Sequence, residues 1–197
     1  VGRVTGSDGK FKRPHLSWGI LLDGYSSGTT VRGNEVVDNA QGGLCVTGGR
    51  NNRIENNIFA NGREHQVLFR GDTFSRNNTF VRNVLQFSLI GADFIGSAGR
   101  WSNRFLAKCD NNMFWTTEGV NHIRNATKPM LPLGTFAKWQ AAGFDKDSVV
   151  ADPKFKDPFK NDFNLPRDSP VYTGIEFEPL PYEKIGLKGF ERAWKKD

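Results

Sequence analysis

Short apolar runs and polar corners alternate at a regular interval along residues 19–117. One asparagine recurs ahead of an apolar run, at intervals of 23, 26 and 29 residues, in the positions Asn34, Asn57, Asn83 and Asn112. A second series of apolar runs precedes these asparagines, at residues 19–22, 43–46 and 66–69. Nothing between them has the 3.6-residue period of a helix. Each repeat therefore predicts two or three short strands joined by corners of Gly, Asn and Ser.

A repeat of about two dozen residues built from short strands predicts a right-handed parallel β-helix. Leucine-rich repeats would show a leucine consensus that is absent here, and propeller blades need units of about 40 residues. In a β-helix, an asparagine tolerates the left-handed backbone of a sharp corner and bonds to its counterpart one coil along, about 4.8 Å away. We therefore expect an all-β, single-stranded solenoid of about four coils in which the recurring asparagines are architectural.

The pattern stops after Thr117, so we assign residues 1–119 to the coils and residues 120–197 to a C-terminal part of the same domain. Residues 134–143 predict one short helix that ends at Gly143. The remainder is rich in Pro, Asp and aromatic residues, and we expect it to lie along the solenoid as an irregular strap that caps the last coil. No N-terminal cap is visible, so we expect another chain or a missing segment to cover the first coil.

Composition and charge narrow the partners of the protein. The 197 residues suffice for one domain, and 37% hydrophobic with 24% charged residues is typical of a globular protein. The net charge of +6 is compatible with an anionic partner, but no nucleic-acid motif and no run of 18 apolar residues occur. We therefore expect neither nucleic acid nor a membrane as partner. Cys45 and Cys109 fall in different sheets of the repeat, which predicts two buried free thiols.

The repeat register predicts which side chains share a face of the solenoid. It places three columns of residues side by side: Asp23, Thr47 and Arg70; Trp18, Gly42 and His65; and Ser17, Gln41 and Glu64. A flat face that carries acidic, basic and aromatic side chains suits an oligosaccharide, since aromatic rings stack on sugars and charged groups bind hydroxyls or carboxylates. We predict that Trp18, Tyr25, His65 and Arg70 bind substrate.

Two carboxyl groups perform glycoside hydrolysis in most enzymes of that class. Asp23 is the candidate acid/base or nucleophile, and Glu64 from the third coil is its candidate partner; an acid on a coil before Val1 is the alternative. The structural interpretations are that Asp23 accepts backbone N–H groups at a corner, that Glu64 and His65 are solvated, and that Trp18 is a packing residue. We expect no cofactor and no metal, because no column gathers three acids for Ca²⁺.

Residues 19–62, GILLDGYSSGTTVRGNEVVDNAQGGLCVTGGRNNRIENNIFANG, resemble the catalytic-face coils of bacterial carbohydrate-active β-helix proteins. The resemblance is greatest to glycoside hydrolase family 141 and looser to pectate-lyase-like proteins. The tail agrees, with Trp139, Gly143, DP at 152–153, DFNL at 162–165 and IGL at 185–187. The resemblance covers about residues 16–190. It implies a secreted or periplasmic protein that degrades polysaccharide.

Three functions follow as expectations from the residues and the resemblance together. The first is a polysaccharide-directed glycoside hydrolase. The second is a non-catalytic β-helix fragment that binds glycan or is purely structural. It is favoured by a departure from the resembled proteins, which often carry a second aspartate at Gly24 and a histidine at Thr47. The third is a lyase acting on an acidic polymer, with positive charge supplied by Arg50, Arg63 and Arg70.

Overall fold

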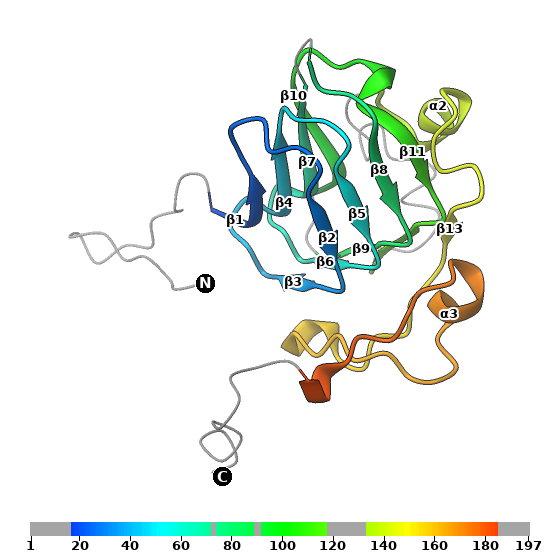
Figure 1. Ribbon diagram of the computed structural model, residues 1–197. Helices are drawn as coiled ribbons and strands as arrows, with labels where there is room; N and C mark the ends of the chain where they lie inside the picture. The colour runs from blue at the N-terminus through cyan, green and yellow to red at the C-terminus, as the bar shows by residue number, and fades with distance from the viewer. Residues whose placement is uncertain (1–16, 72–73, 89–91, 118–132, 185–197) are drawn as a thin grey trace, which may run out of the picture.

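The chain folds as a right-handed parallel β-helix of about four turns, as the sequence pattern predicts (Figure 1). The computed structural model describes residues 17–71, 74–88, 92–117 and 133–184. Every pair of neighbouring strands in its three sheets is parallel. The predicted boundary at residues 119 and 120 lies outside the described residues, and so do residues 1–16 of the part assigned to the coils.

Each turn of the solenoid contributes one short strand to each sheet. The first sheet contains β1 (Trp18–Leu22), β4 (Gly42–Thr47), β7 (His65–Gly71) and β10 (Asp93–Gly99). The second contains β2 (Thr30–Arg32), β5 (Arg53–Glu55), β8 (Asn78–Val81) and β11 (Leu106–Asp110). The third contains β3 (Glu35–Val37), β6 (Ile58–Ala60), β9 (Val84–Phe87), β12 (Met113–Thr116) and β13 (Val149–Val150). One short helix, η1 (Asn103–Phe105), lies between β10 and β11, and the others come after β12: α2 (Phe136–Ala141), η2 (Pro158–Lys160), α3 (Pro170–Gly174) and η3 (Tyr182–Lys184).

The recurring asparagines form a continuous hydrogen-bonded ladder inside one corner of the solenoid. The backbone N–H of Asn34 donates to Oδ1 of Asn57 at 3.0 Å, that of Asn57 to Asn83 at 3.1 Å, and that of Asn83 to Asn112 at 2.9 Å. Their side-chain amides bond in the same order. Asn57, Asn83 and Asn112 are fully buried, so the ladder satisfies backbone groups that water does not reach. The predicted architectural role is confirmed.

One detail of that prediction is wrong. The left-handed residue of each corner is not the ladder asparagine but the residue before it, with φ between +53° and +69° at Gly33, Asn56, Arg82 and Asn111. The left-handed residue reverses the chain, and the asparagine that follows then points inward to bond the next coil. The two tasks of the corner therefore fall on two adjacent residues.

A second, shorter asparagine ladder turns the chain from the first sheet into the second. Oδ1 of Asn52 accepts from the backbone N–H of Thr29, and Oδ1 of Asn78 accepts from that of Asn52, both at 3.0 Å. The amide of Asn78 then donates to the carbonyl of Phe105 at 3.1 Å. Sequence analysis missed this ladder, although the paired asparagines at residues 51–52 and 77–78 carry the same signal.

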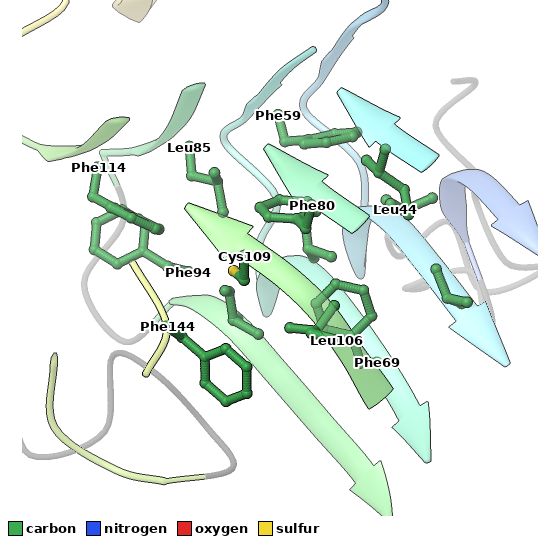
Figure 2. Close-up of a cluster of buried hydrophobic side chains, with 14 of the residues drawn as sticks. Leu44, Phe59, Phe69, Phe80, Leu85, Phe94, Leu106, Cys109, Phe114 and Phe144 are labelled. Carbon is green, nitrogen blue, oxygen red and sulfur yellow. The ribbon is translucent and has the colours of Figure 1, made fainter. Parts of the chain in front are cut away.

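Stacked aromatic side chains fill the interior between the three sheets (Figure 2). Phe59 and Phe80 stack across neighbouring coils with ring centroids 6.5 Å apart, and Phe69 and Phe105 lie 5.1 Å apart. Cys109 lies among these rings, and Cys45 is buried on the first sheet. Both are free thiols, as predicted. Burial raises the pKa of Cys109 and raises that of Cys45 to about 12, so neither is a reactive thiolate near neutral pH.

The predicted helix is confirmed as α2, and it caps the last coil. The Thr135 hydroxyl accepts from the backbone N–H of Lys138 at its start, and Gly143 follows its end with φ of +100°. Trp139 of this helix is fully buried and donates through Nε1 to Asp145 at 2.6 Å. The same carboxyl accepts from Ser148, Cys109 and Asn112, the last asparagine of the ladder. Burial raises the pKa of Asp145, and these four hydrogen bonds oppose the shift.

The strap covers the outer face of the third sheet. Its apolar side chains, which include Phe155, Phe163 and Ile175, pack against Ile58 and Met113 of that sheet. Tyr172 is partly buried in the same cluster. The outer face of the first sheet is not part of this cluster.

We predict that Asn83→Ala lowers the free energy of unfolding by about 3 kcal/mol, because it leaves buried partners on Asn57 and Ile54 without hydrogen bonds. Asn34→Ala is the matched control. Asn34 lies at the start of the ladder and is only partly buried, so we expect a loss of less than about 1 kcal/mol. Urea denaturation measures both values. Equal losses would show that the ladder does not stabilise the interior more than its end.

We also predict that Trp139→Phe destabilises the protein by about 2 kcal/mol, since it removes one buried donor from the Asp145 carboxyl. Trp101→Phe is the control, because the Trp101 indole donates to Asn103 at an exposed site and its loss costs roughly 0.5–1.5 kcal/mol at most. Thermal unfolding followed by circular dichroism compares the two. A smaller effect for Trp139→Phe than for Trp101→Phe would contradict a locking role for Asp145.

Candidate functional site

The outer face of the first sheet carries the predicted columns of side chains. Leu22, Leu44 and Val46 of this sheet point into the core. Leu21, directly before Leu22, and Asp23, directly after it, are exposed. Leu22 pairs with Val46, and Thr47 pairs with Arg70, so Asp23 continues the column of Thr47 and Arg70. Trp18, Gly42 and His65 pair in turn, as predicted, and Asp93 extends their column by one coil.

Two aromatic rings lie together at the N-terminal ends of these strands. The rings of Trp18 and His65 are stacked at 7° with centroids 6.4 Å apart. The indole lies over Gly42, where an added Cβ would come within 2.5 Å of Cζ3 of Trp18. The His65 ring likewise lies over Gly96, where a Cβ would come within 2.5 Å of its Nδ1. The two glycines thus make room for two rings flat on the sheet.

His65 also has an acidic neighbour that sequence analysis did not place beside it. Its Nδ1 lies 3.3 Å from Oδ2 of Asp93, and both side chains are about one-fifth exposed. The contact has ion-pair distance without the geometry of a hydrogen bond. The register of β10 against β7 could have revealed Asp93, but the fourth strand follows a longer loop and escaped the repeat.

Asp23 lies at the other end of the same face. Oδ1 of Asp23 accepts a 2.5 Å hydrogen bond from the hydroxyl of Thr47. This bond, the backbone N–H of Gly24 and the charge of Arg70 hold the pKa of Asp23 below its usual value, so the exposed carboxyl is ionised at neutral pH. Asp23, Tyr25, Thr47 and Arg70 line an open cavity of about 360 Å³. The structure therefore brings together three of the predicted residues, Asp23, Tyr25 and Arg70.

The predicted partnership of Asp23 and Glu64 is not formed, and this corrects the sequence-based hypothesis. Glu64 precedes β7, six residues before Arg70, which shares the column of Asp23. Six residues of strand span about 20 Å, well beyond the roughly 5–9.5 Å between the carboxyl groups of glycosidases. Among the described residues, the column that begins with Asp23 continues through Thr47, Arg70 and Ala98 and holds no second carboxylate.

Tyr25 occupies a backbone position that suits glycine. Its N–H donates to the carbonyl of Thr47, and the N–H of Gly48 donates to that of Arg70 one coil along, so the two residues hold equivalent places. Both are left-handed, with φ of +64° at Tyr25 and +75° at Gly48. A bulky residue in this region costs free energy, and such residues cluster at functional sites.

A second cavity continues from Tyr25 around the corner between the first and second sheets. It measures about 450 Å³ and is lined by Tyr25, Ser27, Gly49, Arg50 and Phe74. Tyr25 is 58% exposed and Phe74 is 68% exposed, so two aromatic rings flank this cavity on the protein surface. Phe74 and Arg50 belong to the site by position. Sequence analysis did not assign Phe74 because it lies in an irregular corner.

No three His, Cys, Asp or Glu residues among those described gather closely enough to hold a metal ion. Within the same residues, no helix has the length and apolar character needed to cross a membrane.

Comparison with known proteins agrees with the fold. Residues 4–115 match the family model described as the right handed beta helix region. The chain belongs to this β-helix family. The β-helix chain is also 27% identical to the uncharacterized protein YwoF of Bacillus subtilis (strain 168), over 77% of its own length and 34% of that protein. It thus spans about a third of that relative. No solved structure matches the chain significantly.

The left-handed backbone at Tyr25 predicts a specific order of stabilities. Tyr25→Gly should be more stable than Tyr25→Ala by roughly 0.5–1 kcal/mol, because the left-handed backbone is strained for alanine and not for glycine. The difference is smaller than the strain itself, since glycine also has the greater conformational entropy in the unfolded chain. Urea denaturation of the two variants measures the difference. Equal stabilities would show that the backbone at this position is not strained.

Proposed function

We propose that this β-helix chain belongs to a polysaccharide-directed protein and holds the sugar chain along the outer face of its first sheet. The observation that carries the proposal is the open row of Trp18, Leu21 and Tyr25, which presents exposed or partly exposed apolar surface along one β-helix face. About five residues of strand separate Trp18 from Asp23, or roughly 16 Å, which is long enough for an oligosaccharide. A polysaccharide ligand would also suit a secreted or periplasmic protein.

The polar groups of this face suit hydroxyl-rich ligands. Ionised Asp23 and the pair His65–Asp93 offer acceptors for sugar hydroxyl groups, while Arg70 offers donors beside Asp23. Aromatic rings placed on either side of such groups are typical of ligand sites that bind one face of a ring by stacking. Trp18 and Tyr25 meet this description from opposite ends of the face.

Glycoside hydrolysis is the second candidate, and one observation favours it. The carboxylate of Asp23 is exposed in a cavity and is held ionised by Thr47 and Arg70, which suits a nucleophile or an electrostatic stabiliser more than a proton donor. Its partner acid would have to come from outside the residues described in this column. We therefore propose a hydrolase of the family 141 type as the second candidate, and we rank a lyase of acidic polymers below it.

The binding proposal predicts that Trp18→Ala and Tyr25→Ala each raise the Kd for a polysaccharide about tenfold, since truncating a stacking aromatic at a binding site costs roughly 1–2 kcal/mol. Affinity electrophoresis against plant and algal polysaccharides measures Kd. Phe159→Ala is the control, because Phe159 is a still more exposed aromatic residue, 76% against 58% for Tyr25, and lies on the strap in η2. Failure to bind any polysaccharide would overturn the proposal.

Hydrolysis is tested with the same polysaccharides and the variant Asp23→Asn. Mass spectrometry of the products should show oligosaccharides from the wild-type protein and none from the variant if Asp23 is catalytic. Products without an unsaturated sugar identify a hydrolase, and products with one identify a lyase. Binding without cleavage by either protein would leave the chain as a glycan-holding module.

A further inference from the structure

A column of three arginines runs along the corner between the first and second sheets. Arg50 and Arg76 pair as a parallel bridge on neighbouring coils. The N–H of Asn51 donates to the carbonyl of Arg76 at 3.2 Å, and the N–H of Asn77 donates to that of Arg104 at 3.0 Å, so Arg104 holds the same place one coil further. All three side chains are exposed. Neighbouring coils repeat at about 4.8 Å, and the column therefore presents positive charge at that interval.

Within the described part of the chain, no acidic side chain neutralises this column. Among the described residues, none of the three arginines forms an ion pair, whereas another cluster in the same solenoid is fully paired. There, Arg53 and Arg82 both lie 2.7 Å from Glu55, and Arg32 bonds to Glu178 of the strap. Like charges directly opposite one another on neighbouring strands are destabilising. Because the three arginines repel one another and no described acidic side chain offsets the repulsion, the column points to a ligand whose anionic groups offset it.

The column begins beside the aromatic cavity. Ser27 occupies the equivalent place in the first coil, since its hydroxyl accepts from the N–H of Arg50 at 3.1 Å and Gly28 donates to the carbonyl of Arg50 at 3.0 Å. Ser27 and Arg50 both line the cavity flanked by Tyr25 and Phe74. A ligand that stacks on these rings thus reaches the first arginine directly and can continue along the other two.

We infer that the protein selects a polyanionic glycan, either a carboxylated or a sulfated polysaccharide. Arg50, Arg76 and Arg104 bind successive anionic groups, and Tyr25 with Phe74 holds a sugar ring. This inference rests on the proposed function for the glycan nature of the ligand. Guanidinium groups bind carboxylate and sulfate oxygens through two parallel N–H donors. The repeat of the coils suits a polymer whose charge repeats from one sugar unit to the next.

A nucleic acid would use the same arginines less well. The ionised carboxyl of Asp23 lines a cavity next to the one flanked by Tyr25 and Phe74, and Tyr25 lines both cavities. The sugar–phosphate backbone of DNA has no hydroxyl donor for this carboxylate, whereas the hydroxyl groups of an acidic glycan donate to it. The charge pattern of the site therefore favours an acidic glycan.

The test compares charged polymers with matched neutral ones. The probes are polygalacturonate against its fully methyl-esterified form, dextran sulfate against dextran, and single-stranded DNA. The variant carries Arg50→Gln, Arg76→Gln and Arg104→Gln together. The control carries Lys138→Gln, Lys146→Gln and Arg167→Gln, which removes equal charge from exposed positions of the cap and the strap. Isothermal titration at several salt concentrations measures Kd and its salt dependence.

We expect the wild-type protein to bind at least one charged glycan more tightly than its neutral counterpart. The triple arginine variant should lose that affinity by about tenfold or more and show a weaker salt dependence, since fewer counterions are released. The control should change Kd less than about threefold. The melting temperature of the arginine variant should not fall, because like charges have been removed.

The outcomes separate the two proposals. Preference for polygalacturonate alone identifies a carboxylated ligand, preference for dextran sulfate alone identifies a sulfated one, and either supports the inference. Equal binding of charged and neutral glycans, unchanged in the arginine variant, would overturn the inference and leave the proposed glycan function intact. Tighter binding of single-stranded DNA than of any glycan would overturn the inference as well. Binding of no polymer would overturn both.

Discussion

The buried corner of each coil depends on an asparagine supplied by the next coil. A β-helix turns its chain sharply inside a water-free interior, and each turn leaves backbone N–H groups that must find acceptors. Asn57 supplies an acceptor to Asn34, Asn83 to Asn57, and Asn112 to Asn83. Each corner is therefore completed by an asparagine of the next coil, and the last asparagine of the ladder needs hydrogen-bond partners from outside the coils.

The cap provides that end. The backbone N–H of Asn112 donates to the hydroxyl of Ser148 at 2.8 Å, and its side chain donates to Asp145 at the same distance. Trp139 and Cys109 also donate to Asp145, so one buried carboxyl joins the ladder, the last coil and α2. A buried carboxyl is costly unless all its acceptor sites are used, and here four donors use them. The irregular C-terminal part is thus a structural requirement of the coils that precede it.

The same regular architecture decides where function can lie. The strap covers the third sheet. On the second sheet, Glu178 neutralises Arg32, and Glu55 neutralises Arg53 and Arg82. Among the described residues, the outer face of the first sheet and the corner beside it stay open and carry two adjoining cavities. Tyr25 marks their junction, because it places an exposed ring in a backbone position that the next coil gives to Gly48. Stacked coils repeat at a fixed interval, which makes this corner suited to a polymer with a repeating charge.

The sequence by itself determined the fold and the lateral neighbours on the candidate face, because a fixed repeat length places equivalent residues on adjacent coils. The columns of Asp23 with Arg70 and of Trp18 with His65 could be predicted in this way, and the structure confirms both. Coil spacing alone does not fix position along a strand, and the hypothesis that pairs Glu64 with Asp23 fails because about six residues of strand separate their columns.

Only the tertiary structure decided the remaining contacts. Asp145 lies 33 residues after Asn112, in a part of the sequence that has no repeat, so no pattern indicates that it closes the ladder. Arg104 joins the column of Arg50 and Arg76 through a corner that contains η1, and the spacing of the three arginines changes from 26 to 28 residues, which hides their register in the sequence. Repetition makes contacts between equivalent strands readable from spacing alone. Where corner lengths vary or the repeat ends, the packing of the folded chain determines which side chains meet.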